Sequence, residues 1–249
     1  MASIKVWDGS QWKDIKSIKY WDGSQWREVK AGYYWNGSSW VAFWRANVVY
    51  DADYSGALHE ISYGDLSTSL RSATPFSYLN GAGGKKDVIW VCDYKGYNVG
   101  EVSVADFSLI RSTSSPTGDA FDIGGNSDHI WFADCTPRVS ELSPTDLSLV
   151  RQSPFKPWDE ITGAGGDSSK IWICATVDDI VAELDPSDFS TVRYTSSPGP
   201  DPAGIGGDSN NIFHSDDDER RLYELSTSDF GIIRYGSGGC SRPRGTGGQ

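Results

Sequence analysis

Carboxylates and arginines at regular spacing are the groups in this 249-residue sequence most able to do chemistry. Two carboxylates flanking a glycosidic bond can cleave it, one acting as acid and the other as base or nucleophile. A catalytic set normally occurs once, whereas here a Glu, an Asp and an Arg recur in every unit of a repeat. This favours turn capping by Asp and ion pairing between Glu and Arg over a ligand pocket repeated between units. The residues are Glu60, Asp65 and Arg71; Glu101, Asp106 and Arg111; Glu141, Asp146 and Arg151; Glu183, Asp188 and Arg193; and Glu224, Asp229 and Arg234.

Other catalytic patterns are missing from the sequence. The three histidines are far apart, and no HExxH, GxSxG, Walker or CxxC motif occurs. A further row of carboxylates, Asp53, Asp93, Asp134 and Asp216, is interrupted only by Ala175. A glycosidase built from repeated units needs a set of carboxylates that differs from one unit to the next, and this row is nearly the same in every unit. We therefore expect a protein that is not an enzyme and needs no cofactor.

Segments that depart from the repeat are the candidate sites. The segment 154–159 is longer and more aromatic than its counterparts, and its tryptophan has no equivalent in the other units. A loop tryptophan among prolines is typical of an exposed contact, so the predicted ligand-binding residues are Trp158, Phe155 and Asp159. The densest acidic run, residues 216–219, could hold a hard cation. It lacks the spaced Asp-x-Asp-x-Asp-Gly pattern, so a solvated turn is favoured over a metal site at Asp216, Asp217 and Asp218.

A repeat of about 41 residues must position these groups. Four of the units have a Gly-Gly pair followed, six residues after its second glycine, by an aromatic residue. Each unit also reads as four short strands, and a period of 40–45 residues with four strands is the signature of a β-propeller. A β-helix or open solenoid would need distinct capping repeats, which we do not find. The aligned pairs are Ile89-Trp90, Ile130-Trp131, Ile171-Trp172 and Ile212-Phe213.

The first unit, which begins at Val48, lacks a Gly-Gly strand of its own. The C-terminal tail supplies one, because Gly248 follows Arg234 at the spacing found in the other units. Such a strand closes a circular array and removes its free edges. We therefore predict an all-β fold with N-terminal β-hairpin repeats over residues 1–45. A five-bladed propeller over residues 46–249, closed by the C-terminal strand, is predicted to follow them.

Two further rows concern packing. Large aromatic residues repeated in strands usually fill cores, so an aromatic row is expected to pack between blades rather than to stack sugars. Cys92 and Cys174 share a row with small residues and are predicted to be buried free thiols. With Cys135 and Cys240 they show no zinc or disulfide spacing. The aromatic row is Tyr50, Trp90, Trp131, Trp172 and Phe213.

The first 45 residues carry a different repeat, in which WDGSQW occurs twice and WNGSSW once. Asp-Gly and Asn-Gly between aromatic runs predict hairpins, and a loop at Gly9 and Ser10 would place Trp7 opposite Trp12. Three linked hairpins are expected to form a small antiparallel sheet. Such a sheet buries little surface and needs a partner, either the other domain or copies of itself. The predicted anchoring or oligomerisation residues are Trp7, Trp12, Trp21, Trp26, Trp35 and Trp40.

Charge separates the two parts of the chain. Residues 1–45 carry a net charge of +3 and the remainder −15. The acidic balance argues against binding to nucleic acid or anionic lipid, and no apolar run is long enough for membrane insertion. The acidic surface is either an ordinary solvated face or an adaptation to concentrated salt. The N-terminus has no apolar stretch typical of a secretory signal, so we expect none to be removed.

The propeller repeats resemble those of haloarchaea and their tailed viruses, which carry variants of GIGGDSDxIWHxD…YELDPSDFS. The resemblance rests on segments 171–190 and 204–209 and extends over residues 48–248. The WDGSxW repeats resemble those of tail and other appendage proteins of tailed viruses. The blade count is similar to that of tachylectin-type lectins, but no lectin motif matches residue by residue.

The resemblance implies a virion protein on the particle surface, as a capsid turret, decoration or tail appendage, made in the cytoplasm and released by lysis. Residues 1–45 would join other virion proteins or copies of the chain. The propeller would face outward toward the host surface, with glycans as expected partners. The alternatives are a lectin-like cellular carbohydrate-binding protein, which would bind sugar as a free protein, and a propeller glycosidase or lyase.

Overall fold

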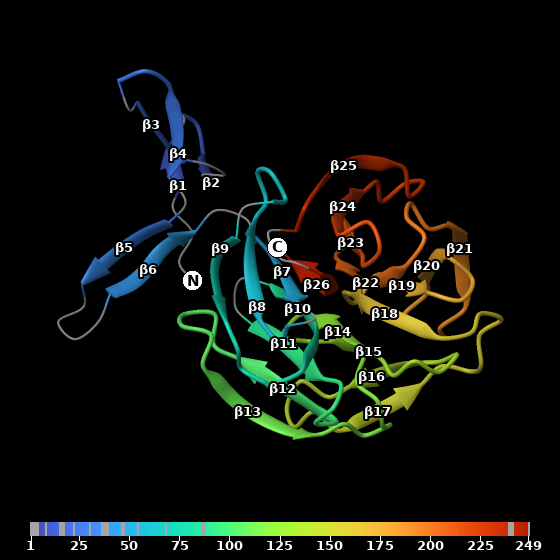
Figure 1. Cartoon of the computed structure of the whole chain (residues 1–249). Helices are drawn as coiled ribbons and strands as arrows, with labels where there is room; N and C mark the ends of the chain where they lie inside the picture. The colour runs from blue at the N-terminus through green and yellow to red at the C-terminus, as the bar shows by residue number, and fades with distance from the viewer. Residues whose placement is uncertain are drawn as a thin grey trace. The chain divides into compact units, whose positions relative to one another are not determined.

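The computed structural model consists of β-strands joined by turns and loops (Figure 1). It describes residues 5–7, 9–14, 18–21, 23–29, 31–35, 40–45, 48–53, 55–67, 69–85, 88–238 and 242–248. Contacts divide the chain into two compact units, Met1–Asn47 and Val48–Gln249. Across the described ranges no helix is long and apolar enough to span a membrane. The predicted all-β class is confirmed.

The first unit contains three β-hairpins. Each is a separate two-stranded sheet, so the expectation of one continuous sheet is wrong. Positive φ angles of 99° at Gly9 and 101° at Gly23 explain why glycine follows aspartate in two of the loops. The hairpins pair β1 (Lys5–Trp7) with β2 (Trp12–Asp14), β3 (Ile18–Trp21) with β4 (Trp26–Val29), and β5 (Ala31–Trp35) with β6 (Trp40–Arg45).

Tryptophans lie opposite one another at the loop end of every hairpin. The register pairs are Trp7 with Trp12, Trp21 with Trp26, and Trp35 with Trp40, as the 14-residue repeat predicts. In the second hairpin the two rings meet edge to face at 5.8 Å, and both are more than half exposed. The side chains of Trp7, Trp12, Trp35 and Trp40 lie outside the described residues.

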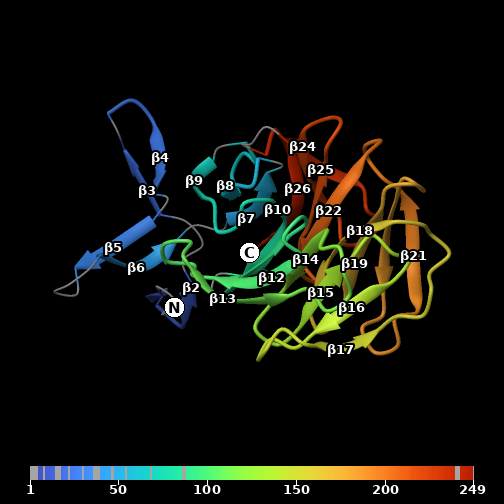
Figure 2. The same cartoon turned by 60° about the horizontal axis from the view of Figure 1, so that its bottom comes forward.

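The second unit is a five-bladed β-propeller of four-stranded antiparallel sheets, as the 41-residue repeat predicts (Figures 1 and 2). In four of the blades the strands follow one another in the sequence from the innermost to the outermost. They are β10 (Leu79–Lys85), β11 (Val88–Asp93), β12 (Asn98–Val102) and β13 (Leu109–Ser114); β14 (Asp122–Gly125), β15 (Ile130–Ala133), β16 (Val139–Leu142) and β17 (Leu149–Gln152); β18 (Ile161–Gly166), β19 (Ile171–Ala175), β20 (Ile180–Leu184) and β21 (Thr191–Ser196); and β22 (Pro202–Gly207), β23 (Ile212–Asp216), β24 (Arg221–Leu225) and β25 (Ile232–Gly236).

The remaining blade joins the two ends of the propeller chain. Its innermost strand is β26 (Pro243–Gly248), followed by β7 (Val48–Asp53), β8 (Leu58–Ser62) and β9 (Ser69–Ala73). Gly248 pairs with Val49 and Thr246 with Asp51, so the predicted closure by the C-terminal strand is confirmed. Pairing both ends of the chain in one sheet closes the ring of blades.

The predicted aromatic row lies in the interior. Tyr50, Trp90, Trp131, Trp172 and Phe213 sit on the second strand of each blade and are almost fully buried, so the packing interpretation is confirmed. Cys92 and Cys174 are buried free thiols, also as predicted, and Cys135 is free. Cys240 lies outside the described residues.

Candidate functional site

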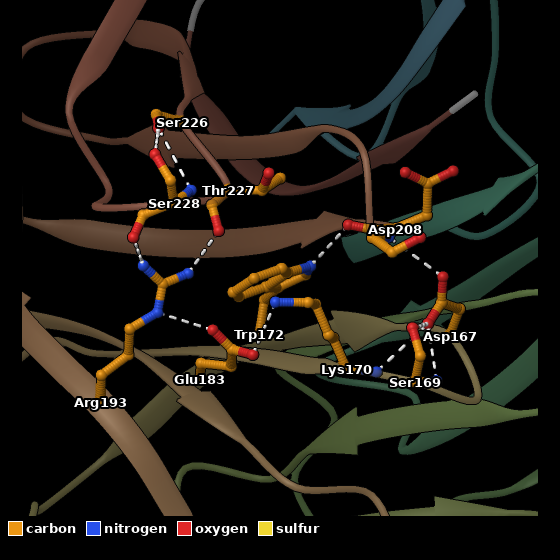
Figure 3. Close-up of polar contacts among 11 residues, drawn as sticks. Asp167, Ser169, Lys170, Trp172, Glu183, Arg193, Asp208, Ser226, Thr227 and Ser228 are labelled. Carbon is orange, nitrogen blue, oxygen red and sulfur yellow. Dashed lines mark hydrogen bonds and ion pairs between the residues drawn. The ribbon is translucent and has the colours of Figure 1, made fainter.

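In four of the five blades the repeated Glu and Arg form an ion pair, and the arginine also donates to backbone carbonyls of the next blade. We call these contacts the inter-blade lock, and Figure 3 shows the one at Arg193. Arg193 Nε donates to Glu183 Oε2 at 2.6 Å, and its Nη atoms donate to the Thr227 and Ser228 carbonyls of the following blade. Burial raises the pKa of Glu183, but hydrogen bonds from Lys170 and Arg193 outweigh it and hold the pKa below its usual value. Arg111 and Arg151 make the same set of bonds. Arg234 pairs with Glu224 and donates to the Gly64 carbonyl of the next blade.

Residues of the aromatic row add further contacts between neighbouring blades to the inter-blade lock. Trp172 Nε1 donates to the Asp208 carbonyl of the next blade at 3.0 Å, and Trp90 makes the equivalent bond to Asn126. Phe230, also from the next blade, packs edge to face on Trp172 and lies 4.5 Å under the Arg193 guanidinium. Phe230 has a φ of 63°, a left-handed conformation that is costly for a non-glycine residue. Burial of its ring between blades offsets that cost.

Replacing Arg193 with methionine should lower the free energy of unfolding by about 2 kcal/mol. The substitution leaves two carbonyls without their donor and the buried Glu183 with Lys170 as its remaining cation. Thermal and urea unfolding of the whole chain would measure the loss. Arg220→Met, at an exposed turn position, is the matched control and should change stability by less than about 0.5 kcal/mol. Equal losses of unfolding free energy in the two variants would contradict a stabilising role for the Arg193 contacts.

The aspartate row caps turns. Asp93 accepts a backbone N–H from Gly96 at 2.9 Å, and Asp53 accepts one from Ser55 at 2.7 Å. Asp134 does the same for Thr136, and Asp216 for Glu219. Capping of the outer turns by the Asp of each Glu–Asp–Arg set is also found, at Asp65, Asp106, Asp146, Asp188 and Asp229.

The acidic run at residues 216–219 is divided among different partners. Asp216 accepts backbone N–H groups from Asp201 and Glu219, whereas the buried Asp217 carboxylate binds Arg242 and Arg244 of the closing segment. Asp218 is exposed. Among the described residues, no group of three or more His, Cys, Asp or Glu side chains is arranged to hold a metal ion. Asp217 therefore contributes to ring closure.

One carboxylate breaks the fivefold symmetry of the interior. Asp122 occupies the innermost-strand position where the other blades have Gly81, Gly163, Gly204 and Gly245. Its carboxylate accepts N–H groups from Ile123, Ala164 and Ile205, which belong to three successive blades. Burial raises the pKa of Asp122 well above its usual value. The side chain is fully enclosed and ties innermost strands together.

The segments that differ between blades gather at one end of the propeller. We call this end the loop face. It consists of the turns between second and third strands and the connections from each outermost strand to the next blade. Backbone hydrogen bonds join the two sets, for example Tyr94 N–H to the Tyr78 carbonyl at 3.1 Å and Lys156 N–H to the Pro137 carbonyl at 2.8 Å. The lock and its repeated turns lie at the opposite end.

The predicted site residues of segment 154–159 have different environments on the loop face. Trp158 is only 5% exposed and belongs to the hydrophobic core between two blades. Its ring lies 5.4 Å from that of the exposed Tyr194. The expectation of an exposed tryptophan is therefore wrong, because the long connection folds back over apolar residues. Phe155 is 68% exposed, and Asp159 is also exposed. Phe155 and Asp159 therefore face solvent, and Trp158 supports the loop from below.

Exposed aromatic side chains distinguish the loop face from the opposite end. Tyr78, Tyr94 and Tyr97 lie on it together with Phe155. In the described part of the propeller, the other exposed large apolar side chains are Val177, also on the loop face, and residues of the outermost strands. Cations cover two of the aromatic rings, with Lys95 at 4.2 Å from the Tyr78 centroid and Arg138 at 3.8 Å from that of Phe155. The sequence analysis did not predict Arg138 as a site residue. The available signal was its position three residues before the repeated Glu141.

The fold and these two ends define the class of the protein as a closed five-bladed β-propeller with a locked end and a variable end. No protein-family model and no curated protein matches the chain. Among solved structures, a chain in the crystal structure of a nidogen/laminin complex has 10% sequence identity and a TM-score of 0.54. That alignment covers 81% of this chain and 98% of the other. Glutaminyl cyclase from Myxococcus xanthus has 12% identity and a TM-score of 0.52, over 67% and 88% of the two chains. At these identities the likeness concerns the fold alone.

Proposed function

We propose that this chain is a non-enzymatic structural protein on the surface of a tailed virus, in which the propeller binds glycans of the host surface through its loop face. The hairpin unit attaches the propeller to other virion proteins or to further copies of the chain. The observation that carries the binding role is the concentration of exposed aromatic side chains on the one end that varies between blades. Aromatic rings combine apolar area with specific geometry and are enriched where proteins bind partners.

The hairpin unit supports the attachment role. Each hairpin is a two-stranded sheet, which is marginally stable in isolation. Trp21 and Trp26 nevertheless present large rings to solvent, and exposed apolar patches of this kind are typical of interaction surfaces. The viral setting is proposed from the resemblance of both repeats to those of tailed viruses.

A non-catalytic role is supported by how the carboxylates are used. Four of the five repeated glutamates pair with arginines, and the aspartate row caps turns. Asp122 is fully enclosed, so a substrate has no access to the one carboxylate that breaks the symmetry of the innermost strands. The histidines lie in three different blades. Of these, His214 is buried and bonded to Ser197 and the Gly204 carbonyl, and burial lowers its pKa to about 4.

The test is to locate the protein. We expect mass spectrometry to find the chain in particles purified from its source, and an antibody against a loop-face peptide to label intact particles at their surface. Absence from purified particles would overturn the viral role. If the chain is present in the particles but the antibody does not label intact particles, the proposal that the loop face points outward is contradicted.

A further inference from the structure

We propose that the loop face binds a sugar that carries an anionic group, a carboxylate or a sulfate, at Arg138 and Phe155. This inference rests on the proposed glycan-binding function and names its ligand class. The exposed ring supplies an apolar platform for the C–H face of a pyranose, and the guanidinium supplies donors for the anion.

Arg138 is half-buried and, among the residues that the structure describes, has no carboxylate partner. In the described part of the chain its Nη1 donates to Gln152 Oε1 at 3.2 Å, and no carboxylate lies within ion-pair distance. Its Nε is buried without a protein acceptor. A guanidinium with unused donors is suited to a planar or tetrahedral oxyanion, which it can bind through two N–H groups. Because Nε is buried and Nη1 is bonded to Gln152, Nη2 is the nitrogen of Arg138 that is left for an anion from outside.

Phe155 is held beside this arginine by an ordered loop. The connection 153–160 is the longest between two blades, and its backbone is anchored by Ser153 N–H to the Val139 carbonyl and by Lys156 N–H to the Pro137 carbonyl, both at 2.8 Å. The buried Trp158 fixes the far side of the loop. Arg138 covers one face of the Phe155 ring, and the ring remains 68% exposed. Positioning a platform and a cation in advance reduces the entropy lost on binding.

A second arginine provides an internal comparison. Arg221 occupies the same position as Arg138, three residues before the repeated Glu of its blade, and its guanidinium lies 4.4 Å over the Tyr235 ring. Its Nη1, however, pairs with Glu219 Oε2 at 2.9 Å. The charge of Arg221 is therefore matched within the protein, whereas that of Arg138 is not. Of these two arginines, we expect Arg138 to bind an external anion and Arg221 not to.

The experiment compares three probes on the whole chain by titration calorimetry. The probes are tri-galacturonate, its carboxyl-reduced counterpart and galactose 6-sulfate. Arg138→Gln and Phe155→Leu should each weaken binding of the preferred anionic probe at least tenfold, and Arg221→Gln less than twofold. The carboxyl-reduced sugar should bind at least tenfold more weakly than tri-galacturonate if the carboxylate is recognised. Preference for galactose 6-sulfate would identify sulfate as the anion.

Binding of the same variants to isolated host envelope polysaccharide separates this inference from the proposed function. Polysaccharide binding that is unchanged in Arg138→Gln, or an equal loss in Arg221→Gln, would overturn the anionic-sugar site while leaving glycan binding intact. Equal affinity for tri-galacturonate and its carboxyl-reduced counterpart, without binding of galactose 6-sulfate, would also overturn the anionic-sugar site and leave glycan binding intact. Failure of the folded chain to bind both the probes and the polysaccharide would overturn the proposed function as well.

Discussion

Removal of residues 242–249 should abolish the cooperative unfolding transition of the propeller. The deletion takes away β26, which is the innermost strand of the blade that joins the two ends of the ring. It leaves β7 paired with β8 alone and the buried Asp217 carboxylate without Arg242 and Arg244. An uncompensated buried charge alone costs about 3–5 kcal/mol, which is a large part of the stability of an ordinary domain.

Differential scanning calorimetry of the full chain and the truncated chain would measure this effect. Deletion of residues 1–47 is the control, because those residues form a separate compact unit. The control should keep the propeller transition, and the C-terminal deletion should lose it. A truncated chain that unfolds cooperatively at the temperature of the full chain would show that the closing strand is dispensable.

The second large effect is expected at the centre of the ring. In Gly206→Ala, the new Cβ would lie 2.5 Å from the Thr246 carbonyl oxygen and 2.9 Å from Gly247 Cα. Both atoms belong to the backbone of the closing strand, so they cannot move aside without displacing β26. We expect a loss of about 3 kcal/mol in the free energy of unfolding, at the upper end of ordinary overpacking.

The control for this substitution is Gly231→Ala. Gly231 is exposed, and the nearest atom to an added Cβ is Asp229 Oδ1 at 3.2 Å. A small shift of this exposed side chain relieves the contact without displacing backbone. Urea unfolding should show a change below about 1 kcal/mol for Gly231→Ala. Comparable changes in the two variants would indicate that the innermost strands tolerate side chains.

Much of the fold could be predicted because its structural units correspond to sequence motifs that repeat at fixed spacing. Equal spacing of Trp90, Trp131 and Trp172 predicts equivalent strands, and Gly248 at the corresponding distance from Arg234 predicts the closing strand. The hairpin register followed from Asp-Gly turns, which require positive φ. That the hairpins form three separate sheets was not predictable, because pairing between hairpins depends on contacts that a local repeat does not encode.

The candidate site was harder to predict because its residues depart from the repeat. Prolines beside Trp158 correctly indicated a loop, but the burial of its ring depends on the path of that loop across two blades. The ion pairs of Arg193 were predictable from spacing, whereas its bonds to the Thr227 and Ser228 carbonyls were not. Backbone acceptors leave no mark in a sequence. Arg138 was overlooked for a similar reason, since its importance lies in the carboxylate that it lacks.

Binding of the whole chain to intact host cells, with and without their envelope glycans, is the most direct test of glycan recognition by the loop face. We expect saturable binding that disappears when the glycans are removed. A Phe155→Ala, Tyr97→Ala double variant should weaken binding at least tenfold, whereas Asn210→Ala, at an exposed turn of the opposite end, should leave it unchanged. Binding that survives glycan removal, or that is lost equally in both variants, would contradict recognition through the loop face.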